Sequence, residues 1–270
     1  MLAKPESGLR VLVVANQKGG VGKTTTAINL GTALAAVGER VLLIDSDPQG
    51  NASTGLGVGR ARRTTTLYDV MMGGRSVMEA VVKTDLPGLD LIPGDADLSG
   101  IELELGHAPR RSFKLRDALE PVRANGAYTY VLVDCPPSLS LLTVNALAAA
   151  DAVLVPLQCE FFALEGLTQL MRTIDLVRGS LNPQLEIQGV VLTMYDRRNS
   201  LSEQVARDVR EHFGPAVYTT VIPRNVRVSE APSFGKPALV YDLKCAGSQA
   251  YLKLAREVVL RERERRAVVA

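Results

Sequence analysis

Residues that bind metals through sulfur or imidazole are scarce in this sequence. Its 270 residues include three cysteines and two histidines. The cysteines, Cys135, Cys159 and Cys245, lie far apart and form no Cys-x-x-Cys pair, so the sequence signals neither a zinc site nor a disulfide framework. We expect reduced, buried thiols. His107 and His212 lie in helical, charged stretches, where we expect surface residues rather than ligands or bases.

Long apolar runs and a strong net charge are also absent. No stretch stays apolar over the roughly 20 residues that a membrane-spanning helix needs, and the N-terminal stretch has no signal-peptide core. We therefore expect a soluble, cytoplasmic protein with no membrane partner. The formal net charge of +2 gives little overall attraction to nucleic acid, so any contact with DNA must come from a local basic patch.

Apolar residues, by contrast, are numerous enough for a large core. The hydrophobic fraction is 46%, which over 270 residues allows one large domain or two small ones. No domain boundary or internal repeat interrupts the pattern. We predict a single domain over residues 1–270, with a flexible N-terminus at 1–8 and a C-terminal helix at 248–270.

The most informative stretch is a short apolar run that opens into the loop K-G-G-V-G-K-T at residues 18–24. Residues 11–14 are uninterrupted apolar residues, typical of a strand buried on both faces, and residues 24–37 show helical spacing. A loop between such a strand and helix directs backbone N–H groups and the positive end of the helix dipole to one point. This arrangement predicts a phosphate site; a turn that only changes the chain direction is the alternative.

Each residue of this loop has a candidate role. The Lys23 ammonium can reach β- and γ-phosphates, the Thr24 hydroxyl can ligate Mg²⁺, and Thr25 can contact an α-phosphate. The loop therefore predicts ATP and Mg²⁺ as cofactors. The backbone that would surround the phosphates comes from four consecutive residues, Gly19, Gly20, Val21 and Gly22.

Acidic residues follow two further apolar runs. Residues 40–44 form a predicted buried strand that leads into Asp45 and Asp47, and residues 130–133 form another that ends at Asp134, in the form of a Walker B element. Ligands of open α/β sheets bind outside the carboxyl ends of the strands, so these carboxylates are placed to face the phosphate loop. Asp134 would hold Mg²⁺ through a water or order its shell. A polar turn stabilised by aspartate is the alternative at 45–51.

Strand and helix patterns alternate along the rest of the chain. Further strands are predicted at 89–92, 152–156 and 188–193, and further helices at 97–105, 112–123, 141–149, 164–178 and 201–213. The stretch 51–63 is rich in Gly, Ser, Thr and Arg, and we expect a mobile loop there. The alternation predicts an α/β fold, doubly wound, with a mostly parallel sheet flanked by helices on both faces.

The loop departs from the usual phosphate-loop pattern, because Gln17 stands where that pattern has glycine and a second lysine, Lys18, heads the loop. This form resembles the deviant Walker A motif of the ParA/MinD group of P-loop ATPases. With the motifs at 45–55, 131–137 and 221–233, nearly the whole chain resembles a ParA/Soj-type partition ATPase. The resemblance implies that Lys18 reaches the partner's phosphates in an ATP-bound homodimer. It also implies that Asp47 orients the attacking water and that Asp45 supports the metal shell.

The same resemblance assigns two further surfaces. It implies that the backbone around Pro223 and the Asn225 side chain border the adenine ring, although a proline-bounded surface loop is the alternative. Arg198 and Arg227 look closest to the family's DNA-binding arginines, and Arg224 lies in the same loops, so we expect these three to contact non-specific DNA. A solvated charge run is the alternative. The family further implies nucleoid association and a ParB-like partner that stimulates hydrolysis.

Two other functions share this ATPase fold. A nitrogenase-reductase-like electron carrier needs cysteines that bridge an iron–sulfur cluster, and Cys135 has no evident second ligand. A MinD-like spatial regulator needs a helix that binds membrane surfaces, and the C-terminal helix lacks a sustained apolar face. The phosphate loop also begins close to the start of the sequence, which leaves no room for an N-terminal helix-turn-helix domain. We therefore expect no autorepression through specific DNA binding.

Overall fold

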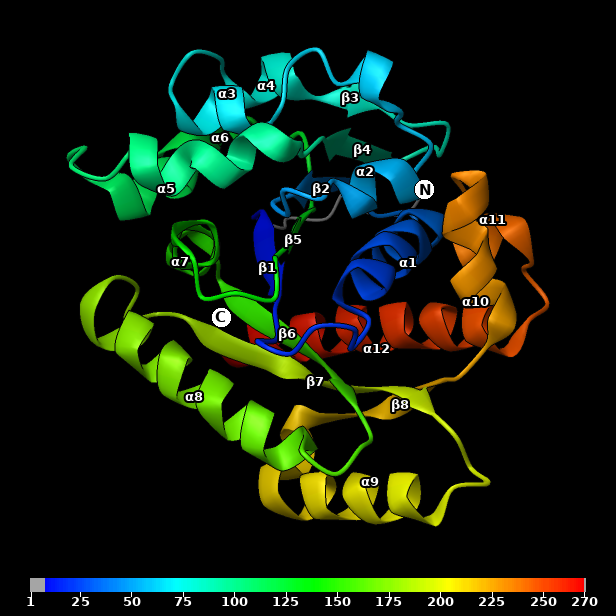
Figure 1. The fold of residues 1–270 in the computed structure, drawn as a ribbon. Helices are drawn as coiled ribbons and strands as arrows, with labels where there is room; N and C mark the ends of the chain where they lie inside the picture. The colour runs from blue at the N-terminus through cyan, green and yellow to red at the C-terminus, as the bar shows by residue number, and fades with distance from the viewer. Residues whose placement is uncertain (1–7, 270) are drawn as a thin grey trace.

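The computed structural model describes residues 8–269, and its centre is one sheet of eight strands (Figure 1). The strand order is β3-β4-β2-β5-β1-β6-β7-β8, and every pair except β3–β4 is parallel. This confirms the predicted fold class. The strands are β1 (Arg10–Val14), β2 (Val41–Asp45), β3 (Val82–Lys83), β4 (Leu89–Ile92), β5 (Tyr130–Asp134), β6 (Ala152–Gln158), β7 (Glu186–Tyr195) and β8 (Val217–Pro223).

Helices cover both faces of this sheet, each over its own apolar core. The first and last helices of the chain pack against each other on one face (Figure 1). That face carries α1 (Lys23–Ala36), α2 (Asn51–Gly55), α10 (Val226–Glu230), α11 (Ala238–Tyr241) and α12 (Ala246–Val269). The opposite face carries α3 (Leu67–Met71), α4 (Val77–Ala80), α5 (Ile101–Glu104), α6 (Lys114–Asn125), α7 (Leu141–Ala149), α8 (Ala163–Ser180) and α9 (Ser200–Phe213).

The three strands that lead to the predicted site are neighbours in the sheet. Every residue of β1, β2 and β5 is buried, because helices cover the sheet on both sides and leave no solvated face. Parallel pairing sets Val14 beside Asp134 and Asp45 beside Asp134. The carboxyl ends of all three strands therefore meet at one edge of the sheet, as the sequence predicts.

Most predicted elements are confirmed within a few residues, but the mobile loop predicted at 51–63 is wrong. That stretch forms α2 and a 3₁₀ turn, η1 (Arg60–Arg62). Its composition suggests a loop, yet Ala52, Leu56 and Val58 are buried in the same core as α1. The helix predicted at 97–105 begins as a 3₁₀ turn, η2 (Ala96–Gly100), before α5. The remaining 3₁₀ turns are η3 (Arg111–Phe113), η4 (Gly214–Ala216) and η5 (Ala231–Phe234).

The predicted C-terminal helix is confirmed as α12, and a buried ion pair fixes it to the start of β1. Arg10 Nε donates to Glu262 Oε1 at 3.1 Å, and both side chains are almost fully buried. Arg10 Nη2 also donates to Gln188 Oε1 of β7 at 3.2 Å. The two ends of the described chain are thus held together across the sheet. The N-terminal flexibility predicted at 1–8 falls almost wholly on residues 1–7, outside the described residues.

Glu262→Ala is expected to lower the free energy of unfolding by about 2 kcal/mol, because the Arg10 Nε–H loses its buried charged acceptor. The Arg10 guanidinium then keeps only the Glu186 carboxylate, at 2.9 Å, and the Gln188 side-chain oxygen. Chemical denaturation of the purified variant measures this loss. Glu264→Ala is the matched control, since Glu264 is exposed on the same helix, and its effect should stay within about 0.5 kcal/mol. Equal losses of unfolding free energy in the two variants would show that the buried ion pair stabilises the protein no more than an exposed side chain does.

Candidate functional site

The phosphate loop joins β1 to α1 at the carboxyl edge of the sheet. Gly20 and Gly22 have left-handed backbones, with φ of 75° and 85°, which bend the loop back over the start of α1. No side chain of residues 8–269 caps this helix, and the first N–H groups of a helix have no intrahelical partner. The first turn of α1 also carries no acidic residue. The N-terminus of this 14-residue helix is therefore open to an anion.

A hollow of about 700 Å³ lies in front of this helix, within the size range of small-ligand pockets. Most of the predicted nucleotide-binding residues line it, namely Gly19, Gly20, Gly22, Lys23, Thr24, Thr25 and Asp47. Several lining residues were missing from the prediction, including Gln49, Asn51, Leu98, Ile101, Glu102, Pro136, Pro137 and Met194. Gln49, Asn51 and the two prolines lie in the motifs at 45–55 and 131–137, so the sequence carried a signal for them. Leu98, Ile101 and Met194 come from segments that approach through folding alone.

Lys23 is the cation of this hollow. Its side chain is buried, and Nζ donates to the Lys18 carbonyl at 2.8 Å. Burial lowers the pKa of Lys23, while the negative charges of Asp134 and Asp47 act in the opposite direction. A buried ammonium with one carbonyl partner has further N–H donors for phosphate oxygens.

Asp45 and Asp134 form a pair of buried carboxylates on adjacent strands. Asp45 Oδ2 accepts hydrogen bonds from the Ser53 N–H and hydroxyl, both at 2.7 Å, but neither oxygen of Asp134 has a partner among the described residues. Burial raises the pKa of Asp45 to about 6 and that of Asp134 well above its usual range. Coulomb repulsion acts in the same direction on each pKa, from Asp47 on Asp45 and from Asp45 on Asp134. Such a pair favours a bound cation.

The oxygen-bearing side chains of this site suit Mg²⁺ better than a metal ion that is bound by protein side chains alone. Within residues 8–269 there is no group of three or more His, Cys, Asp or Glu side chains arranged to hold a metal ion. Two carboxylates and the Thr24 hydroxyl are the predicted ligands. Mg²⁺ is usually held by one or two carboxylates together with waters and substrate phosphates, so the unpartnered oxygens of Asp134 suit this ion.

Asp47 lies at the wall of the hollow. It is 9% exposed, and its Oδ1 accepts a hydrogen bond from the Gln49 N–H at 2.9 Å. Its own N–H donates to Asp45 Oδ1 at 3.3 Å. These contacts tie the Asp47 turn to the buried carboxylate pair and keep the Asp47 side chain beside the phosphate loop.

Lys18 and Val21, the two remaining residues of the predicted phosphate loop, do not line the hollow. The Lys18 ammonium forms an ion pair with Glu160, which follows β6, and the side chain is 38% exposed. Val21 is buried, and its carbonyl accepts a hydrogen bond from the Thr193 hydroxyl at 2.9 Å. The structure thus places Lys18 at the rim of its own site, held by an acidic residue of the same chain.

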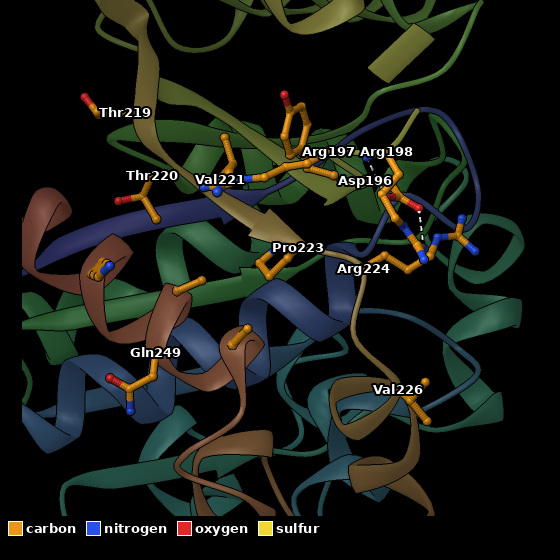
Figure 2. Close-up of a pocket in the computed structure, with 14 residues that line it drawn as sticks. Asp196, Arg197, Arg198, Thr219, Thr220, Val221, Pro223, Arg224, Val226 and Gln249 are labelled. Atoms are coloured by element: carbon orange, nitrogen blue, oxygen red, sulfur yellow. Dashed lines mark hydrogen bonds and ion pairs between the residues drawn. The ribbon is translucent and has the colours of Figure 1, made fainter. Parts of the chain in front are cut away.

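Pro223 and Asn225 do not line the hollow that contains the phosphate loop. Asn225 caps α10, where its Oδ1 accepts a hydrogen bond from the Val228 N–H at 3.3 Å. Pro223 ends β8 and lines a second hollow (Figure 2). The adenine contact of these two residues stays a prediction.

The second hollow, of about 1000 Å³, gathers basic side chains from distant segments (Figure 2). Arg197 and Arg198 from the turn after β7 line it together with Arg224, and Lys253 of α12 completes it. Arg198 is 88% exposed and pairs with Asp196 at 2.9 Å, which lowers the pKa of Asp196 to about 2. Lys253 carries no local signal for this place in the sequence, because only the packing of α12 along β8 brings it here.

Arg227 lies apart from the other two predicted DNA-binding arginines. It belongs to α10, pairs with Glu230 at 3.1 Å, and does not line the second hollow. Arg198 and Arg224 are therefore brought together by the fold, and Arg227 is not. Within residues 8–269 no helix is both long and apolar enough to cross a membrane.

Known proteins similar to this chain agree with the geometry. The protein family described as "AAA domain" matches residues 9–187. The chain is 80% identical to the chromosome partitioning protein ParA of Caulobacter vibrioides over 97% of its length and 98% of the relative. It is 51% identical to the sporulation initiation inhibitor protein Soj of Bacillus subtilis over 92% of its length and 98% of that relative.

A solved structure extends the likeness to three dimensions. The structure described as cobyrinic acid a,c-diamide synthase from Mycobacterium smegmatis with bound ADP and magnesium has a TM-score of 0.81 and 39% identity. The match covers 93% of this chain and 94% of that one. From the open helix N-terminus, the paired carboxylates and these identities together, it follows that the chain belongs to the ParA/Soj family of chromosome-partitioning proteins, which have a P-loop nucleotide-binding fold.

Proposed function

We propose that this chain is a Mg²⁺-dependent ATPase that partitions chromosomal DNA. The 80% identity to a chromosome partitioning protein over nearly the whole chain supports the cellular role. The ADP and magnesium described in the Mycobacterium smegmatis structure support the cofactors. The observation that carries the chemistry is the position of the unpartnered Asp134 carboxylate beside the buried Lys23, at the open N-terminus of α1.

In this proposal the chain binds the phosphates mainly through fixed charges and dipoles. The loop from Gly19 to Gly22 and the N-terminus of α1 surround the phosphate oxygens, and the Lys23 ammonium neutralises charge on them. Thr24, Asp45 and Asp134 would hold Mg²⁺, which supplies further neutralisation of the β- and γ-phosphates when bound. Phosphoryl transfer depends on such positioning and charge stabilisation more than on covalent chemistry.

ATP hydrolysis needs a positioned water and a further positive charge that neutralises the phosphates. We assign the water to Asp47, whose carboxylate lines the hollow and is oriented by the Gln49 N–H. We assign this positive charge to Lys18 of a second copy of the chain, in a homodimer that encloses the nucleotide. Lys18 lies at the rim and pairs with Glu160 of its own chain, so it must change partners to reach phosphates.

The second hollow is the proposed contact with DNA. Its exposed arginines suit the phosphate backbone, which carries no sequence information. Binding would depend on the ATP-bound dimer, and a ParB-like partner would promote hydrolysis and release. This cycle would place the protein on the nucleoid in the cytoplasm and move the chromosome.

The double variant Arg198→Glu, Arg224→Glu is expected to weaken binding to non-specific duplex DNA by about tenfold with ATP present, because phosphate contacts dominate such binding. Its affinity should also depend less steeply on salt, with the slope of log K against log salt reduced by about one for each lost contact. ATP affinity should be unchanged. A fluorescence-anisotropy titration at several salt concentrations measures each quantity.

Arg75→Glu is the control for a charge reversal elsewhere on the surface, because Arg75 is exposed and lies between α3 and α4, outside both hollows. Its DNA affinity should remain close to that of the wild type. Equal weakening in the control and the double variant would show a general charge effect and refute the assignment of the second hollow. No ATP-dependent DNA binding by the wild type would refute the proposed function itself.

A further inference from the structure

Arg63 makes four hydrogen bonds to the turns around the nucleotide site. Nη2 donates to the Gly50 carbonyl at 3.2 Å and to the Thr54 hydroxyl at 2.7 Å. Nη1 donates to the Gly94 carbonyl at 3.1 Å, and Nε donates to the Val58 carbonyl at 3.0 Å. One guanidinium therefore joins the turn after β2, both ends of the α2 segment and the turn after β4.

The two glycines in this set lie against the backbone that carries the catalytic carboxylates. Gly50 has a left-handed φ of 62°, and its N–H donates to the Asp47 carbonyl at 2.9 Å. A Cβ at Gly50 would overlap the Arg63 guanidinium. A Cβ at Gly94 would meet the Asp45 carbonyl at 2.5 Å and the Asp47 carbonyl at 3.0 Å. The Arg63 guanidinium therefore packs against the outer side of the turn from Asp45 to Gly50.

Ser53 holds the inner side of the same turn. Its hydroxyl donates to Asp45 Oδ2 at 2.7 Å and accepts a hydrogen bond from the Gly94 N–H at 3.1 Å. Gly94 is therefore bonded on one side to Ser53 and on the other to Arg63. The turn that bears Asp47 lies between these two bonded groups.

Arg63 differs from the arginines beside it. Arg60 and Arg62 are exposed, whereas Arg63 is half-buried, and burial lowers its pKa. Arg62 makes one hydrogen bond, to the Lys83 carbonyl at 3.0 Å, at the edge of the sheet away from the nucleotide site. A solvated charge run does not account for a guanidinium whose donors face four acceptors of converging turns.

We propose that Arg63 is a positioning residue for ATP hydrolysis, which fixes the turn of Asp47 against the strand ends through Gly50, Thr54 and Gly94. The inference rests on the proposed function, in which Asp47 positions the attacking water. A carboxylate displaced by about 1 Å loses much of its effect, because positioning contributes a large part of the rate. The planar, forked guanidinium suits this role, and a lysine ammonium in its place does not span the same acceptors.

Steady-state ATP hydrolysis and ADP affinity of Arg63→Ala and Arg63→Lys test this role. Both variants are expected to lower kcat at least about tenfold, while the dissociation constant for ADP, which needs no attacking water, changes less than about threefold. Hydrogen exchange should become faster at the Asp47, Gln49 and Gly50 amides, whose bonds form the turn. The matched control, Arg62→Ala, should leave all three quantities unchanged.

Thr54→Val serves if Arg63→Ala does not fold. With little change of shape it removes the acceptor of Arg63 Nη2 and the hydrogen bond that the Thr54 hydroxyl donates to the Gly50 carbonyl at 3.1 Å, and it should lower kcat about threefold. Thr54→Ser keeps both bonds and should keep the wild-type kcat. The inference is overturned by a folded Arg63→Ala with wild-type kcat, by equal effects in Arg62→Ala, or by a fall in kcat matched by an equal loss of ADP affinity. Absence of ATP hydrolysis in the wild type would refute the proposed function instead. In that case, the rate of hydrogen exchange at the Asp47, Gln49 and Gly50 amides would show whether Arg63 holds this turn.

Discussion

Lys23→Ala is expected to lower the affinity for ATP at least about 100-fold. Lys23 is the buried cation of the hollow, and its ammonium has donors free for phosphate oxygens beyond the one bonded to the Lys18 carbonyl. A hydrogen bond to a charged group contributes about 1.5–3 kcal/mol, and 1.4 kcal/mol corresponds to tenfold in affinity. Two such bonds to phosphates therefore account for the expected loss. Isothermal titration with ATP and Mg²⁺ measures it.

Lys83→Ala is the control for this experiment, because the Lys83 side chain is 80% exposed and pairs with Asp90 outside the hollow. Its ATP affinity should equal that of the wild type. Thermal unfolding of Lys23→Ala separates loss of the ligand contact from loss of the fold. ATP affinity that stays at the wild-type level in a folded Lys23→Ala would remove the basis for the phosphate-loop assignment.

Asp47→Ala is expected to lower kcat for ATP hydrolysis about 100-fold and to leave ATP binding unchanged or tighter. A side chain that positions or activates water contributes typically 10²–10⁴-fold to the rate, whereas removal of a carboxylate from the hollow relieves repulsion of the phosphates. Single-turnover hydrolysis and equilibrium titration of the same preparation give the two quantities separately. DNA binding with ATP should persist, because the variant remains in the ATP-bound state.

Two further variants test the role of the Asp47 carboxylate more specifically. Asp85→Ala removes an exposed aspartate from the surface and should hydrolyse ATP at the wild-type rate. Asp47→Asn keeps the side-chain oxygen that accepts from the Gln49 N–H, so it tests the charge apart from the turn. Wild-type turnover in Asp47→Ala would refute the role of this carboxylate and, with it, the basis of the Arg63 inference.

The centre of the site was predictable because its signals are local. A run of apolar residues followed at once by an acid or by a glycine loop marks a buried strand and its carboxyl end, as at Val14, Asp45 and Asp134. Since parallel strands end at the same edge, these local signals are enough to bring the three positions together. The structure confirms this through the register of β1, β2 and β5.

The surroundings of the site were not predictable in the same way. The residues at 51–63 have the composition of a loop, yet burial of Ala52 against α1 makes part of them helical. Pro223 and Asn225 are close in sequence, but the strand end directs Pro223 to the second hollow while Asn225 caps α10. Composition does not record which core a short segment packs against, so tertiary packing overrides it.

The sequence by itself determined the alternation of strands and helices, the phosphate loop from Lys18 to Thr24, and the acids at the strand ends. It did so because each of these features depends on residues close together in the chain. Only the tertiary structure decided that Lys18 pairs with Glu160, that Lys253 joins the arginines of the second hollow, and that Arg63 closes the turn of Asp47. Those contacts join segments far apart in sequence, and their geometry depends on how the whole core packs around the sheet.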